Sequence, residues 1–271
     1  MTVSTADKRA KFRKLHESGC FVLPNPFDAG SAKALARLGF QAIASTSAGF
    51  VWTIGKADNR VTLDEVLGHL AALSTAVDIP VNADFEGGFA DAPDGVAANV
   101  ARAVATGVAG LSIEDSTGDK ANPLYARDLA VARIKAARDA IDAAGGQVLL
   151  TGRCEAFLWG QSDLAFVIDR LTAYAEAGAD CLYAPGIKTR EEIAAVVKAV
   201  APKPVNLLIG ASGLSLRQAE DLGVRRISVG GSLARMAWAG FMRAAKEMAE
   251  QGSFNELAAG YPGGELNKMF G

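Results

Sequence analysis

Acidic side chains follow two apolar stretches of the chain, where they could bind a metal ion. The first stretch, Val81-Asn82-Ala83-Asp84-Phe85-Glu86-Gly87-Gly88-Phe89, begins after a proline as a buried strand and then turns acidic. The second, Leu111-Ser112-Ile113-Glu114-Asp115, repeats this order. An unpaired carboxylate in a protein core is costly, so Asp84 and Glu86 need a partner. Mg²⁺ prefers oxygen ligands and usually keeps several waters, and we therefore predict a divalent cation where the two stretches end.

A regular alternation of strands and helices surrounds these stretches. Short, nearly continuous apolar runs, typical of strands buried on both faces, occur at 21–25, 42–47, 80–85, 110–115, 148–154, 181–185, 204–209 and 226–231. Helical spacing of apolar residues predicts helices over 1–19, 31–38, 62–77, 93–106, 127–144, 162–177, 189–200, 215–222 and 232–250. These eight strand–helix units predict one (β/α)₈ TIM barrel domain over 1–271, with 232–271 as a C-terminal helical extension. A doubly wound sheet is the alternative, but no GxGxxG follows the first strand.

Polar residues gather at the predicted C-terminal ends of the strands, where barrels of this kind place their active sites. They are Asn25, Asp28, 45–47, Asn82, Asp84, Glu114, Asp115, Arg153, Glu155, Asn206 and Ser228. Because they come from at least five strands, we expect them to converge on one mouth of the barrel.

The composition excludes several classes of partner. A net charge of −2 offers no electrostatic footprint for nucleic acid or an anionic membrane. Cys20, Cys154 and Cys181 are widely spaced, so neither a disulfide framework nor a zinc site is expected. The first fourteen residues carry no apolar signal segment, and no apolar run is long enough to span a bilayer. We expect a reduced, cytoplasmic protein whose partner is a small molecule.

Several of these motifs occur together in one known family. The segment 82–89 is similar to a metal-binding strand that usually reads Asp-Ala-Asp-x-Gly-x-Gly, and 110–115 is similar to Gly-x-x-x-Glu-Asp. The segment 152–157 is similar to Ala-Arg-x-Glu-Ala-Phe, and the 24–25 and 177–180 segments also fit. Over roughly residues 10–250 the chain therefore resembles the isocitrate lyase / phosphoenolpyruvate mutase superfamily.

The resemblance implies an Mg²⁺-dependent enzyme, with Mn²⁺ as an alternative ion, that makes or breaks a C–C or P–C bond next to the carboxylate of a small 2-oxo acid. It implies that Asp84 holds the metal directly or through water, and that Asn82 stands at the position of the first Asp of the metal strand. Glu114 would orient metal-bound waters. Asp58, in the 55–59 loop, matches the acidic residue of a mobile gating loop.

The same resemblance implies the groups that hold the substrate. Backbone N–H groups of Ser47, Ala48 and Gly49 would face a substrate carboxylate. Arg153 would bind the same anionic end or the enolate oxygen, and its planar fork suits a carboxylate. Asn206, at the end of the seventh strand, is a further substrate-binding candidate.

Departures from the family pattern narrow the expected reaction. Lyases of the superfamily carry a loop with a Cys general acid after the fourth strand, whereas 118–125 here has neither Cys nor His. Mutases and phosphonopyruvate hydrolases carry a Thr-Asn-Ser-type loop there, of which Asn122 is a partial match, and a His where this chain has 184–185. Asn82 replaces the first metal-strand Asp, and Glu86 replaces a Gly.

These departures favour decarboxylation of a 2-oxo acid such as oxaloacetate, because CO₂ leaves without a general acid and Mg²⁺ stabilises the enolate. The alternatives are phosphonopyruvate hydrolase or phosphoenolpyruvate mutase activity, and, less favoured, methylisocitrate cleavage. A non-catalytic 2-oxo acid binding protein is the alternative from a different class.

Structural roles compete with each site assignment. Asp84 could cap a loop, and Glu114 with Asp115 could cap the following turn. Arg153 could form a core ion pair with Glu114 or Glu155.

The last predicted helix, 232–250, is apolar over a wide arc, as in buried helices. Members of the superfamily exchange this helix between subunits, which implies a homo-oligomer, a dimer or tetramer. The glycine-rich 252–271 segment either packs on a neighbouring subunit or is partly disordered.

Overall fold

Eight strands and the helices between them build the chain in the order that the sequence predicts. The computed structural model describes residues 3–161, 163–210 and 213–271. The strands are β1 (Phe21–Leu23), β2 (Ile43–Ala44), β3 (Val81–Asp84), β4 (Gly110–Glu114), β5 (Leu149–Arg153), β6 (Cys181–Tyr183), β7 (Val205–Leu208) and β8 (Arg226–Ser228).

The α-helices are α1 (Thr5–Leu15), α2 (Ala29–Arg37), α3 (Ser47–Thr53), α4 (Leu63–Ala76), α5 (Pro93–Ala105), α6 (Arg127–Ala143), α7 (Leu164–Glu176), α8 (Arg190–Val200), α9 (Leu216–Asp221), α10 (Ser232–Gln251) and α11 (Gly263–Phe270). Two 3₁₀ helices are η1 (Ala156–Trp159) and η2 (Asn255–Ala259).

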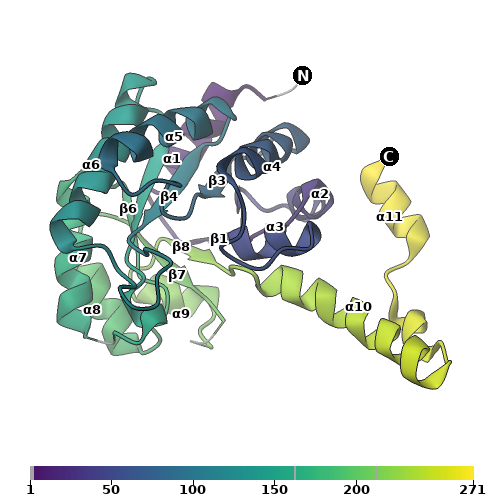
Figure 1. Cartoon of the computed structure of the whole chain (residues 1–271). Coiled ribbons are helices and arrows are strands. Elements are labelled where there is room, and N and C mark those ends of the chain that lie inside the picture. The colour runs from purple at the N-terminus through teal and green to yellow at the C-terminus, as the bar shows by residue number, and fades with distance from the viewer. Residues whose placement is uncertain (1–2, 162, 211–212) are drawn as a thin grey trace.

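The strands form a nearly closed parallel barrel, which confirms the predicted (β/α)₈ class. Their order is β1-β8-β7-β6-β5-β4-β3-β2, and every ladder between neighbours is parallel. The N–H of Ala44 donates to the carbonyl of Pro24 at 3.0 Å, which links β2 to the end of β1. Helices surround this barrel in Figure 1. All eight strands therefore direct their C-terminal ends toward one mouth.

The core lies between the strands and the surrounding helices. Val96 and Val100 of α5 and Ile134 and Ile141 of α6 are at most 2% exposed and belong to one apolar cluster. Several helices begin at a side-chain cap, such as the Thr62 and Glu65 capping box of α4. Hydrophobic burial on one helix face thus holds the barrel in the register that the site requires.

Two helices differ from the prediction, and the start of a third lies outside the described residues. Helix α1 is shorter than the predicted 1–19, because His16 caps it and the chain then enters β1. Helix α3 was not predicted; Thr46 starts it by accepting a hydrogen bond from Gly49 N–H. Ser162, the predicted start of the 162–177 helix, lies outside the described residues, and α7 begins after Asp163.

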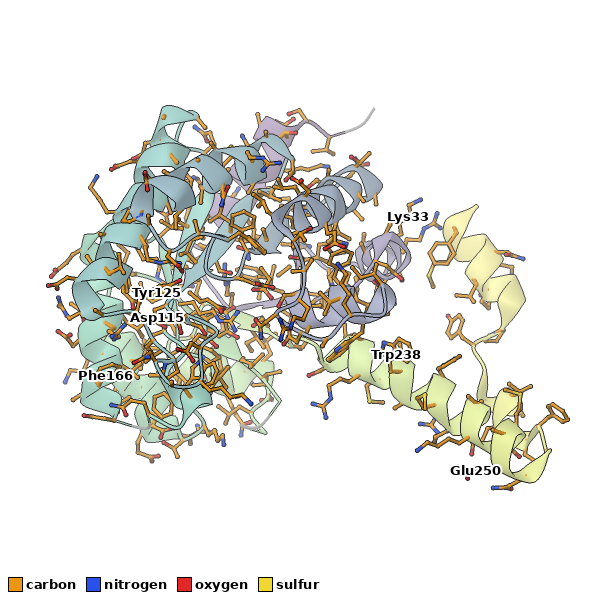
Figure 2. All side chains as sticks on the ribbon, viewed as in Figure 1. Lys33, Asp115, Tyr125, Phe166, Trp238 and Glu250 are labelled. Carbon is orange, nitrogen blue, oxygen red and sulfur yellow. The ribbon has the colours of Figure 1, made fainter. Side chains whose placement is uncertain are left out.

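Helix α10, which follows β8, extends away from the barrel in Figure 1, and α11 returns toward α2. Within one chain α10 is largely exposed, with Ala234 and Glu247 as its buried residues. Figure 2 shows Trp238 on the part of α10 near the barrel and Glu250 near its far end. The structure gives the tail two helical segments, η2 and α11, and the carbonyl of Lys268 accepts from Arg37 on α2. Exchange of α10 between subunits stays a prediction.

No helix in the described ranges is both long and apolar enough to cross a membrane.

Candidate active site

A cavity of about 200 Å³ lies at the mouth of the barrel and extends into its interior. Most of the predicted site residues line it, as do several residues that were not predicted. The predicted lining residues are Asn25, Ser45, Ser47, Ala48, Asp58, Asn82, Asp84, Arg153, Asn206 and Ser228. Glu114 lines an adjacent polar cavity, together with Asn59, Glu86 and Tyr125. The convergence that the sequence predicts is therefore present.

Arg153 stands at the centre of the mouth, at the end of β5. Its Nη1 lies 3.2 Å from Asp84 Oδ1 and 3.3 Å from Glu114 Oε2, and its Nε donates to Glu155 Oε1. The guanidinium carbon also lies 5.1 Å from the centre of the Tyr183 ring. Parallel pairing of β4 with β5 sets Glu114 beside Arg153, and this register explains the ion pair. Arg153 therefore forms the ion pairs with Glu114 and Glu155 that the sequence analysis gave as an alternative role, and it forms a third with Asp84.

Asp84 is the last residue of β3 and is fixed by residues that follow β2. Its Oδ2 accepts from Ser47 N–H at 2.9 Å, and its own N–H donates to Ser45 Oγ at 2.8 Å. Its side chain is 18% exposed, so it stays open to the cavity. This residue is held by Ser45 just after β2, by the start of α3 and by Arg153.

The mouth holds more negative charge than positive. Burial, with Glu155, Asp84 and Glu86 nearby, raises the pKa of Glu114 well above its usual value, although Arg153 opposes this. Burial and the charge of Asp84 raise the pKa of Glu86 to about 7. Burial also raises the pKa of Asp58, with a contribution from Asp84. A cation beside these carboxylates would relieve their mutual repulsion.

The donor set fits a hard divalent cation, although the described residues do not form a closed metal cage. In the described part of the chain, no group of three His, Cys, Asp or Glu side chains has the arrangement to hold a metal. Asn82 Oδ1 and Glu86 Oε1 are buried and have no hydrogen-bond partner. Mg²⁺ commonly uses one or two carboxylates and completes its shell with water and substrate oxygens. An open set of Asp84, Glu114 and nearby oxygens matches that requirement.

The predicted backbone N–H groups fall at the start of α3, with different partners. Ser47 N–H donates to Asp84, and Gly49 N–H donates to Thr46 Oγ1 at 3.3 Å. Gly49 packs beneath the cavity, where a side chain would meet Thr46, Phe27 and Ala234. Ser47 and Ala48 face the cavity, whereas Gly49 supports the turn.

Asn206 lies inside the barrel on β7 and is 1% exposed. Its Nδ2 donates to Ser228 Oγ at 2.9 Å, and its Oδ1 accepts from Arg226 Nε at 2.8 Å. Asn206 is therefore part of a buried polar layer below the mouth.

A buried network below the mouth supports Glu155 and was not predicted. Asp115 Oδ2 accepts from Arg170 Nη1 at 3.0 Å and from Tyr174 hydroxyl at 2.7 Å. Its Oδ1 accepts from Glu155 N–H at 2.8 Å. Arg170 also donates to the carbonyl of Tyr125, and Figure 2 shows Asp115 and Tyr125 close together. Asp115 is thus a support of the site rather than a cap of the following turn.

The 116–125 loop, which lacks the lyase Cys, folds back on itself beside the mouth. Ser116 and Leu124 form an antiparallel bridge, and Thr117 Oγ1 donates to the carbonyl of Asn122 at 2.5 Å. Tyr125 closes the loop, with the Arg133 guanidinium 3.9 Å from its ring centre.

Sequence reasoning missed the roles of Tyr183, Thr151 and Arg226 in this region. A charged residue at the first position of a predicted buried strand, as at Arg226, was the available signal. Tyr183 and Thr151 carried none, because single polar or aromatic residues are common in strands.

The fold and site together define a barrel protein whose mouth combines carboxylates with one central arginine. The family model of phosphoenolpyruvate phosphomutase matches residues 12–249, and the chain belongs to that family. Its structural neighbours lie in the phosphoenolpyruvate mutase/isocitrate lyase superfamily, whose members are lyases or mutases.

Similar proteins include structures and sequences from this superfamily. A Burkholderia cenocepacia J2315 protein described as a candidate lyase/mutase is 49% identical with a TM-score of 0.94, covering 98% of this chain and 96% of that one. Oxaloacetate acetylhydrolase in complex with oxalate is 27% identical with a TM-score of 0.86, covering 98% and 94%. Oxaloacetate decarboxylase of Rhodopseudomonas palustris (strain BisB5) is 30% identical over 227 residues, or 79% of this chain and 74% of the relative.

Proposed function

We propose that this protein is an Mg²⁺-dependent enzyme, with Mn²⁺ as an alternative ion, that cleaves a C–C or P–C bond of a small 2-oxo acid through an enolate. Decarboxylation of oxaloacetate is the favoured reaction. The observation that carries the proposal is the placement of Arg153 among Asp84, Glu114 and Glu155 at the mouth. Similarity to oxaloacetate decarboxylases at about 30% identity supports it.

One group of residues in the cavity would hold the metal, and another would bind the substrate. Asp84 and Glu114 would hold the metal or its waters, with Asn82 oxygen nearby and Asp58 on the loop that faces the cavity. The bound metal supplies Lewis-acid stabilisation of negative charge on the substrate oxygens.

Substrate binding would use the remaining polar groups of the cavity. Arg153 would donate charge-assisted hydrogen bonds to the enolate oxygen or carboxylate, since its fork suits two oxygens. Ser47 and Ala48 would contact the carboxylate end at the start of α3, with Gly49 shaping that turn. Asn206 would contact the substrate from inside the barrel.

Absence of a Cys or His in the 116–125 loop favours decarboxylation among the possible cleavages. CO₂ leaves without a general acid, and the enolate is protonated in a later step, whereas cleavage of a bond to an alkoxide carbon needs an added acid for the carbanion that it releases. Phosphonopyruvate hydrolysis and phosphoenolpyruvate mutase activity are the alternatives, and methylisocitrate cleavage is less favoured.

A non-catalytic 2-oxo acid binding protein is the second candidate. One observation favours it: Arg153 occupies the space between Asp84 and Glu114, so the carboxylates already have a positive partner.

One assay separates these candidates. Purified protein is incubated with Mg²⁺ and oxaloacetate, phosphonopyruvate, phosphoenolpyruvate or methylisocitrate, and pyruvate is followed with an EDTA control. We expect metal-dependent pyruvate from oxaloacetate above the free Mg²⁺ background. If none of the four compounds gives pyruvate but oxaloacetate still raises the melting temperature of the protein, the result would support the binding protein instead.

We also propose that the chain forms a homo-oligomer in which α10 is exchanged. Large apolar side chains are exposed along α10, namely Leu233, Met236, Trp238, Phe241, Met242 and Met248. A contiguous exposed apolar face commonly marks a protein interface. Light scattering of wild type and Phe241→Asp tests this, with a smaller assembly expected for the variant and an unchanged mass contradicting it.

A further inference from the structure

Arg226, the first residue of β8, is buried inside the barrel without an acidic partner. It is 2% exposed. Its Nε donates to Asn206 Oδ1 at 2.8 Å, its Nη2 donates to Thr151 Oγ1 at 3.0 Å, and its Nη1 lies 3.3 Å from His16 Nε2. Arg226 forms no salt bridge with any carboxylate of the described residues. A buried charge without a counter-ion is costly, so this guanidinium needs an anion.

His16, the titratable side chain among the hydrogen-bond partners of Arg226, does not supply that anion. His16 Nδ1 lies 2.8 Å from the carbonyl of Phe12, so Nδ1 carries the proton and Nε2 accepts from Arg226. Burial, with the charge of Arg226 second, lowers the pKa of His16 to about 3. All three direct partners of Arg226 are therefore neutral.

Arg226 shares its cavity with Arg153, and the two are in opposite electrostatic states. Arg153 has three carboxylate partners, which compensate its positive charge. Both arginines line the same cavity of about 200 Å³. A substrate anion entering this cavity would therefore find its free positive charge at Arg226.

The remaining donors of Arg226 match a carboxylate. A guanidinium has five N–H donors, and three of those on Arg226 have the partners named above. Two are left, which is the number that a bidentate carboxylate uses.

The distance from the mouth suits a short dicarboxylate. Arg226 contacts Thr151, which lies two residues before Arg153 on β5. Two residues along a strand span roughly 7 Å, so the inner site lies about one small ligand length below the mouth.

We propose that Arg226 binds a second acidic group of the substrate, so that the substrate class is a small dianionic 2-oxo acid. This inference rests on the proposed function, which places the 2-oxo and carboxylate end at the mouth. Arg226 acts as a substrate-binding residue that selects for the far acidic group.

A kinetic consequence follows when the far group is the carboxylate that leaves as CO₂. Arg226 then stabilises the bound substrate and not the transition state, in which that charge disperses. Replacing it should raise KM for oxaloacetate while kcat is kept or increased.

The test compares a ligand that has a carboxylate at the far end with one that has none. 2-Oxobutyrate carries a methyl group where oxaloacetate carries its far carboxylate, and 3,3-difluorooxaloacetate keeps that carboxylate. Calorimetry with Mg²⁺ present measures both ligands on wild type, Arg226→Met, Asn206→Asp and Arg225→Met. We expect wild type to prefer the dicarboxylate, and Arg226→Met to lose that affinity by about 10- to 100-fold with 2-oxobutyrate changed less than about threefold.

The variant Asn206→Asp still tests the inference if Arg226→Met does not fold. Asn206→Asp leaves Arg226 in place and gives its Nε a carboxylate of nearly the same shape, so the dicarboxylate preference should fall at least tenfold. Arg225→Met is the control, because Arg225 donates to the carbonyl of Gly19 and does not line the cavity.

Equal weakening of both ligands, or a preference retained by folded Arg226→Met or by Asn206→Asp, would overturn the inference. So would a wild type that binds 2-oxobutyrate as tightly as the dicarboxylate. The assay measures binding and not turnover. Arg226-dependent binding without pyruvate formation would therefore contradict the proposed function alone, and pyruvate formation without that dependence would contradict this inference alone.

Discussion

Two arginines of one cavity, Arg153 at the mouth and Arg226 in the barrel interior, have contrasting surroundings. Arg153 has three carboxylate partners, which come from β3, from β4 and from the residue just before η1. Arg226 has an amide, a hydroxyl and a neutral imidazole. An excess of buried charge of one sign is energetically unfavourable. The excess carboxylates at the mouth should therefore attract a cation, and the unpaired guanidinium in the interior should attract an anion. The same residue type thus supports two different binding roles, decided by its neighbours.

The largest expected effect comes from removing the carboxylate that anchors the mouth. Asp84→Ala deletes the proposed metal ligand and leaves Arg153 with one partner fewer, and kcat/KM for oxaloacetate should fall at least about 1,000-fold. Circular dichroism checks the fold, and exposed Asp139→Asn on α6 is the matched control. Activity within about threefold of wild type would rule out the metal assignment of Asp84.

Removing the metal itself should have a similar effect and be reversible. EDTA should abolish metal-dependent pyruvate formation, and excess Mg²⁺ should restore it, because the proposed donor set is open and the residues that the structure describes form no closed cage. Full activity after dialysis against EDTA would show that the carboxylates of the mouth serve another purpose.

Changing Arg153 to lysine tests the fork at the mouth. Lysine keeps the charge but cannot contact Asp84, Glu114 and Glu155 together, so we expect kcat to fall about 100-fold. The steady-state rate with oxaloacetate and saturating Mg²⁺ measures it. An unchanged kcat would mean that only the charge of Arg153 matters.

Asp115→Asn tests how the mouth is held in place. The variant removes a buried charge that partners Arg170 and Tyr174, and should lower the free energy of unfolding by about 3 kcal/mol. Urea unfolding measures this, and Asp169→Asn serves as the control, since its pair with Arg127 is exposed and should contribute much less to stability. Equal effects of the two variants would contradict the supporting role of Asp115.

Thr151→Val has the smallest expected effect, and it tests whether Thr151 or Arg226 contacts the far acidic group. It removes the hydroxyl that accepts from Arg226 Nη2 and keeps the side-chain shape, so stability should fall by about 1–2 kcal/mol. Freed of one partner, Arg226 should keep its preference for a dicarboxylate in calorimetry. Loss of that preference would show that Thr151, and not Arg226, contacts the far acid.

Sequence reasoning succeeded where the signal is local and failed where it depends on distant contacts. The apolar runs and helix spacing predicted all eight strands, because a strand that is buried on both faces has a nearly continuous run of apolar residues. Helix α3 was missed, since seven residues give too few turns to show a period. The carboxylates at strand ends were found because acids directly after apolar runs are unusual. Arg226 was assigned only to a strand, because nothing local distinguishes a paired from an unpaired buried charge.

The sequence by itself determined the barrel class, the family and the convergence of Asp84, Glu114 and Arg153 on one mouth. The alternation of strands and helices suffices for the barrel and for the convergence, and the resemblance of the 82–89, 110–115 and 152–157 motifs indicates the family. Only the tertiary structure decided which charges are neutralised. Glu114 meets Arg153 through the β4–β5 register, and His16 meets Arg226 across 210 residues of chain. Electrostatic energy depends on distances in space and on burial, and neither is encoded in any short stretch of residues.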